Sequence, residues 1–66
     1  MNTLGQNLRR IRTKKGLTQA KLAELADINR RYYQEIEACR KNPTVVVTAR
    51  LRKALKADWL DVLKGV

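Results

Sequence analysis

The chain has 66 residues, with 15 lysines and arginines against 6 aspartates and glutamates, so its net charge is +9. A chain this short buries only about 60% of its unfolded surface, and we expect one domain over residues 1–66 without an internal active site or a small-molecule ligand. Histidine and serine are absent, which excludes Ser-His and Cys-His nucleophiles and a histidine-ligated zinc ion. We therefore predict a protein that is not an enzyme and uses no metal or cofactor.

The excess of positive charge indicates a polyanionic partner, because an isolated domain would be destabilised by its own repulsion. Cys39 is the only cysteine, so no disulfide forms within the chain, as is typical of a reducing compartment. The longest apolar run, Val45–Val47, is three residues, far too short for a membrane span. We expect a cytoplasmic protein with no membrane contact.

The first predicted helix covers about residues 4–15. Thr3 and Gln6 have the spacing of a capping box, in which each side chain bonds to the other residue's backbone. Gly16 stands where a left-handed residue would end the helix.

Two helices of about eight residues, 19–26 and 30–38, are predicted next, with a turn of about three residues between them. Thr18 and Asn29 are their N-cap candidates, and Ile28 in the turn is expected to point into the core. A connection this short forces a sharp crossing, which is the geometry of a helix-turn-helix.

The last two predicted helices follow a loop at Pro43, since the residue before a proline is biased away from helix. Thr44 caps a helix over about 45–55, and Asp58 with Asp61 marks the start of a short final one. The predicted fold class is all-α with five helices.

The segment GLTQAKLAELADINRRYYQEIE resembles the Cro/CI-type (Xre) helix-turn-helix family of phage-repressor-like DNA-binding domains. The motif R-x-x-K-G-L-T-Q-x-x-L-A, followed by I-E, carries this resemblance, and NRRYYQEIE…RKNPT is also similar to restriction–modification controller proteins. The resemblance implies a compact five-helix, lambda-repressor-like domain of bacterial or phage origin. It further implies a transcriptional regulator that binds a pseudo-palindromic double-stranded DNA operator as a homodimer. The helix at about 29–38 would then lie in the major groove.

The same resemblance assigns roles to individual positions. Gln19 matches a residue that grips a phosphate and supports the recognition helix. Other positions match residues that face base edges or the nearby DNA backbone: Asn29, Arg30, Arg31, Gln34 and Glu35. The loop after this helix matches a backbone-contacting segment: Arg40, Lys41 and Asn42.

Local physics also indicates an anion at the start of the third helix. Arg30 and Arg31 lie in its first turn, where cations oppose the helix dipole, and an outward arginine can pair with guanine O6 and N7. Glu35 is four residues after Arg31 and either forms a simple helical ion pair, orients the arginine or accepts from cytosine N4. Tyr32 lies to one side of the helix and either packs on its flank or touches DNA.

Two charged residues fall on predicted buried stripes. Glu37 shares a stripe with Tyr33 and Ile36, and Arg12 shares one with Leu8. A buried carboxylate needs a partner, so we predict an Arg12–Glu37 ion pair, which the family resemblance also implies.

The C-terminal part is more apolar than a monomer needs. Trp59 is most simply a core residue, but the family dimerises through this region. The expected homodimer interface contains Val46, Trp59, Leu60 and Val62.

Two positions depart from the family pattern. Cys39 and Asp27 occupy sites where the family often has glycine. Asp tolerates left-handed backbone better than most residues. At Cys39 the sequence leaves two alternatives, a glycine-like end of the third helix or a different C-terminal cap.

Two other interpretations remain at this stage. A helix-turn-helix can serve as a protein-interaction module, for example an antitoxin that neutralises a toxin. A generic basic domain would bind RNA or an acidic membrane without sequence preference.

Overall fold

A computed structural model describes residues 3–66, and it contains five helices and no strand within that range. The helices are α1 (Leu4–Lys14), α2 (Gln19–Ala26), α3 (Arg30–Glu37), α4 (Val45–Leu55) and α5 (Trp59–Val62). The predicted all-α fold class is confirmed. The first and third helices each end one residue earlier than predicted, because Lys15 and Ala38 take up C-cap backbone angles near ψ 1°. None of the helices between residues 3 and 66 is long and apolar enough to cross a bilayer.

The predicted N-caps are confirmed for the first four helices. Thr3 and Gln6 form both bonds of the capping box, at 3.1 and 2.9 Å. Thr18 and Thr44 each accept a backbone N–H through the side-chain oxygen, at 3.0 and 3.1 Å. Asn29 accepts two, from the first turn of α3, at 2.8 and 3.2 Å. These side chains fix where each helix begins, because they satisfy N–H groups that have no partner within the helix.

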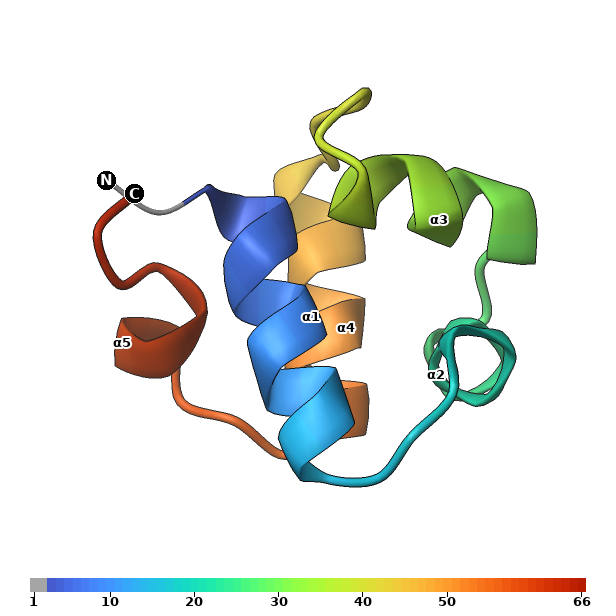
Figure 1. Ribbon diagram of the computed structural model, residues 1–66, viewed down its shortest axis with the longest axis horizontal. Coiled ribbons are helices and arrows are strands. Elements are labelled where there is room, and N and C mark those ends of the chain that lie inside the picture. The colour runs from blue at the N-terminus through green and yellow to red at the C-terminus, as the bar shows by residue number, and fades with distance from the viewer. Residues whose placement is uncertain (1–2) are drawn as a thin grey trace.

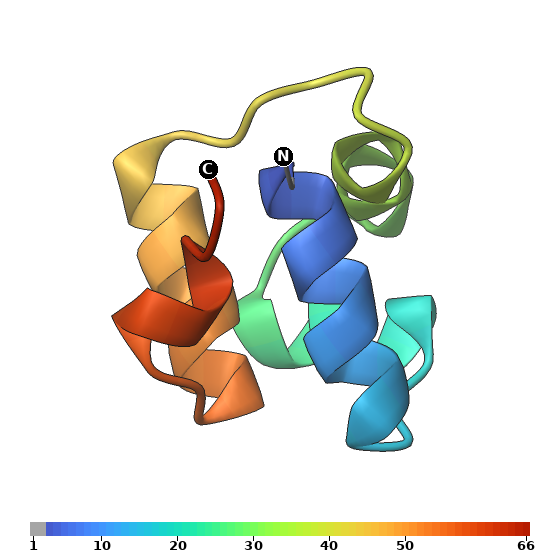
Figure 2. The same cartoon turned by 60° about the vertical axis from the view of Figure 1, so that its left-hand side comes forward.

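The helices pack as a bundle in which α2 contacts α3 and α4, while α1 contacts α3 and α5. Figures 1 and 2 show α3 and α5 on opposite sides of the molecule. Each helix supplies fully buried side chains to one core, among them Leu8, Leu22, Tyr33, Leu51 and Val62. Among the described residues, the outward side chains of α3 are exposed at Arg30, Arg31 and Gln34, and this helix lies across the molecule from α5 (Figure 1).

A close approach between α1 and α3 depends on Gly5. A Cβ atom at this position would lie 2.2 Å from the carbonyl oxygen of Ile36, which no side chain can tolerate. The sequence pattern did not single out this glycine, because the close approach exists only once both helices are packed.

Between residues 3 and 66, three non-glycine residues adopt left-handed backbone angles, in addition to Gly16 (φ 73°) and Gly65 (φ 74°). Asp27 (φ 55°) ends α2 within the turn, as its tolerance for this region suggests. Cys39 (φ 61°) takes the conformation that a glycine would take after α3, and its sulfur lies 3.1 Å from Thr3 Oγ1. Lys56 (φ 53°) ends α4 in the same way. Cys39 therefore reproduces the glycine-like turn instead of changing it.

The C-terminal segment is fastened to α1 by Asn7. Its side-chain amide is 1% exposed and donates to the carbonyls of Val62 at 2.8 Å and Lys64 at 2.9 Å. Buried amides need such partners, so Asn7 holds the short α5 against the bundle. Its place beside Leu8 and four residues before Ile11 is the signal that could have marked it as buried.

Candidate nucleic-acid interface

The segment α2–turn–α3 forms a helix-turn-helix. The turn is short because Asp27 closes α2 in a left-handed conformation and Asn29 opens α3 two residues later. Ile28 between them is half-buried and packs against the core, as predicted. The two helices are thus held at a defined crossing, and the outer face of α3 is presented to solvent.

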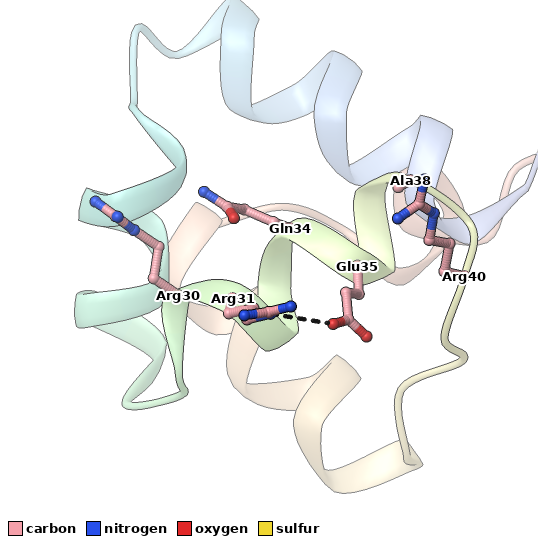
Figure 3. Close-up of a pocket in the computed structure, with 6 residues that line it drawn as sticks. All are labelled: Arg30, Arg31, Gln34, Glu35, Ala38 and Arg40. Atoms are coloured by element: carbon pink, nitrogen blue, oxygen red, sulfur yellow. Dashed lines mark ion pairs between the residues drawn. The ribbon is translucent and has the colours of Figure 1, made fainter.

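That outer face is hollowed and strongly cationic. The hollow is lined by Arg30, Arg31, Gln34, Glu35, Ala38 and Arg40. Figure 3 shows the first four of these side chains fanning out along α3, with Arg40 reaching back from the loop beyond the helix. The side chain of Arg31 is 88% exposed. The structure thus gathers five of the ten predicted DNA-contacting residues on one concave surface.

The loop after α3 carries three of the predicted contacts. Arg40, Lys41 and Asn42 are all exposed, and the Arg40 N–H donates to the carbonyl of Glu35 at 2.9 Å. This bond ties the start of the loop to α3, so the loop cations flank the same hollow. Tyr32 is half-buried and packs against the core; a contact between its exposed part and DNA stays a prediction.

The inner side of α3 is anchored by the Glu37 carboxylate, whose side chain is 4% exposed. Arg12 donates to it from Nε at 2.6 Å and from a second guanidinium nitrogen at 3.1 Å, so the predicted ion pair is present and bidentate. The buried hydroxyl of Tyr33 also donates to this carboxylate. Gln19 Nε2 donates to it as well, at 3.0 Å. One carboxylate therefore connects α1, α2 and α3.

The electrostatics of this network follow from its contacts. Burial alone would raise the pKa of the Glu37 carboxyl, but the hydrogen bonds from Arg12, Tyr33 and Gln19 outweigh burial and hold that pKa below its ordinary value. Burial raises the pKa of Tyr33, and its bond to Glu37 raises it further. The hydrogen bond to Glu37 also raises the pKa of Arg12. At neutral pH, Glu37 is therefore a carboxylate that accepts hydrogen bonds from the Arg12 cation and from the neutral Tyr33 hydroxyl.

Two predicted DNA contacts have a second, structural task. The side-chain N–H of Gln19 donates to Glu37, which agrees with the expectation that Gln19 supports the recognition helix. Asn29 uses its side-chain oxygen as the cap of α3. The bonds from Tyr33 and Gln19 to Glu37 were missed in the sequence, where only the Arg12 partner was expected.

The expected dimer residues differ in their exposure, and the interface itself stays a prediction. Val46, Trp59 and Leu60 are 63%, 40% and 88% exposed. Val62 is 0% exposed, so the expectation that its side chain meets a second copy is wrong: it fills this chain's own core, behind the amide of Asn7. Trp59 is not a core residue either.

The ring of Trp59 lies beneath the guanidinium of Arg52, whose central carbon is 5.1 Å from the ring centroid, a cation–π distance. Three further large apolar side chains are exposed, outside the expected set of dimer residues: Val45, Leu63 and Val66.

These features define a helix-turn-helix domain. Two crossed helices are joined by a short turn, and the second helix has a cationic outer face and an anchored inner face. Comparison with known proteins identifies the family of this domain. Residues 3–63 match the family model described as a helix-turn-helix domain.

Two sequence relatives and one solved structure are informative. Over 59 residues the chain is 38% identical to an uncharacterized HTH-type transcriptional regulator of Bacillus subtilis (strain 168), YqaF, covering 89% of this chain and 78% of that protein. Over 53 residues it is 40% identical to the immunity repressor protein of Bacillus phage phi105, covering 80% of this chain and 37% of the repressor. The crystal structure of the restriction-modification controller protein C.AhdI from Aeromonas hydrophila superposes with a TM-score of 0.87 at 35% identity, over 91% of both chains.

The chain therefore belongs to the helix-turn-helix family of DNA-binding transcriptional regulators, and within it to the repressor-like Xre type. These proteins are regulators and not enzymes.

Proposed function

We propose that this protein regulates transcription by binding a specific double-stranded DNA site with α3 in the major groove. The observation that carries the proposal is the outer face of α3, where Arg31 is 88% exposed at the N-terminal end of a helix anchored from behind by Glu37. An exposed arginine at this end of a recognition helix has the reach to pair with guanine O6 and N7. Arg30, Gln34, Arg40, Lys41 and Asn42 are the further contacts in this proposal.

We propose that the DNA-bound form is a homodimer. Support comes from the exposed apolar side chain of Leu60 (88%) on α5, a helix on the opposite side of the molecule from α3 (Figure 1), and from Val46 (63%) in the first turn of α4. A two-fold dimer through this region would place two copies of α3 in successive major grooves, about 34–36 Å apart, on a pseudo-palindromic site.

In vitro selection of bound duplexes, followed by sequencing, tests the proposal directly. The protein should enrich one motif with two related half-sites. Arg31→Ala should cost about 1–3 kcal/mol of discrimination at the base that Arg31 contacts. Lys53→Ala on α4, an exposed cation away from the hollow, is the matched control and should leave the motif unchanged.

A generic binder of polyanions would enrich no motif, and both variants would bind all duplexes more weakly by the same factor. The dimer is tested separately by sedimentation of the protein with and without the selected duplex. Leu60→Asp should shift the complex from two protein chains per duplex to one.

A further inference from the structure

Glu35 is an acidic residue on a surface otherwise suited to a polyanion. Among the six residues that line the hollow it is the single acid, beside three arginines. Its side chain is 29% exposed, with Oε1 3.7 Å from Arg31 Nε and Oε2 3.7 Å from Lys41 Nζ. One carboxylate thus holds two cations, one on α3 and one in the loop that follows, and Figure 3 shows Arg31 turned towards it.

Folding does not require this arrangement. Exposed ion pairs contribute little to stability, and both cations are largely in solvent, with side chains 88% and 58% exposed. The charge of Glu35 should therefore affect binding of the proposed DNA partner more than it affects folding stability.

Phosphates and base edges affect this cluster in opposite ways. A phosphate competes with Glu35 for the same two cations, and phosphate contacts supply nearly all affinity for non-specific DNA. Base edges in the major groove are uncharged: guanine offers acceptors to Arg31, and cytosine N4 offers a donor to Glu35. The cluster is therefore compatible with a base pair and unfavourable for a bare phosphate.

We propose that Glu35 is a specificity-determining residue, which withholds Arg31 and Lys41 from the phosphates of non-operator DNA and directs Arg31 to base edges. This inference rests on the proposed function, namely sequence-specific binding of duplex DNA. It adds that discrimination arises partly by weakening the wrong complexes.

The test is Glu35→Gln, which removes the charge at nearly constant shape. Affinity for a random duplex and for the selected operator is measured by fluorescence anisotropy over a series of salt concentrations. Each cation released to a phosphate steepens the log–log salt dependence by about 0.9, which corresponds to about eightfold tighter binding at 0.1 M salt. Random-duplex binding should tighten accordingly, operator binding should tighten less, and their ratio should fall.

In the proposal, Glu35 holds Arg31 and Lys41 away from phosphates, an arrangement called the clamp below. Two controls separate this clamp from a simple effect of net charge. Glu24→Gln removes the same single charge from another exposed pair, with Lys21 at 4.0 Å on α2, and should leave the salt dependence unchanged. In a background of Arg31→Gln and Lys41→Gln, adding Glu35→Gln should give no gain. A gain in either control would mean that net charge or direct repulsion is responsible, and would overturn the clamp.

The proposed function and this inference fail in distinguishable ways. A wild-type chain that binds the selected duplex no more tightly than a random one overturns both. A wild-type chain that discriminates, with a Glu35→Gln variant that discriminates equally well, overturns the inference alone. Melting curves by circular dichroism establish that all variants are folded, which we expect because the ion pairs of Glu35 contribute little to stability.

Discussion

The two faces of α3 differ in almost every physical respect, although they alternate along eight residues. The inner face holds Tyr33, Ile36 and Glu37; the Glu37 carboxylate accepts from Arg12 on α1, Gln19 on α2 and the Tyr33 hydroxyl on α3 itself. The outer face holds Arg30, Arg31 and Glu35, and the ion pairs that Glu35 makes with Arg31 and with Lys41 are 3.7 Å long, with both cations largely in solvent.

The difference teaches that the charged residues of one short helix have separate tasks. The inner charges hold the orientation of α3, while the outer charges remain available to a partner. Changes on the inner face should therefore alter folding stability, and changes on the outer face should alter DNA binding.

The largest effect is expected from Glu37→Ala. Removing one member of a buried ion pair leaves the other charge uncompensated, which typically costs about 3–5 kcal/mol, and Arg12 would be left with an 11% exposed side chain. Chemical denaturation followed by circular dichroism measures the loss. Glu24→Ala on α2 is the matched control and should change stability by less than about 0.5 kcal/mol. An unchanged melting temperature for Glu37→Ala would contradict the division between the faces.

A related effect should appear on acidification. The pKa of Glu37 is lowered in the folded state, so its contribution is complete above the unfolded carboxyl pKa of about 4.3 and is lost as the pH falls through the folded-state pKa. The stability difference between the wild type and Glu37→Gln should therefore shrink below about pH 4.3. A difference that stays constant down to pH 2 would show that the charge of Glu37 is not involved.

A smaller loss is expected from Tyr33→Phe. The change removes one hydroxyl donor from a buried carboxylate, which costs about 1–3 kcal/mol when the acceptor is left without a replacement. Tyr32→Phe, at the neighbouring half-buried tyrosine, should cost almost nothing. Urea denaturation of both variants measures the contrast, and equal losses would show that the Tyr33 hydroxyl makes no special contribution.

The smallest change in stability is expected from Arg31→Ala. Its pair with Glu35 lies in solvent, and such helical pairs contribute about 0.3–0.5 kcal/mol. The melting temperature should be nearly unchanged, while discrimination between DNA sites falls. A variant that loses both together would place Arg31 among the residues that hold the fold.

Much of this organisation could be predicted from the sequence because its signals are local. A cap needs an oxygen at one position and N–H groups two or three residues later, so Thr3, Thr18, Asn29 and Thr44 identified where four helices begin. Helical periodicity likewise assigned Tyr33 and Glu37 to one face and Arg31 to the other, and the need of a buried carboxylate for a partner led to Arg12.

Other features depend on which segments meet, and only the tertiary structure decided them. Gly5 is required because α1 approaches the carbonyl of Ile36, and the bond from Gln19 to Glu37 exists because α2 crosses behind α3. Val62 is buried, not available to a partner, because Asn7 draws the C-terminal segment onto α1. Periodicity places a residue on a face of its helix, but the packing of distant segments determines what covers that face.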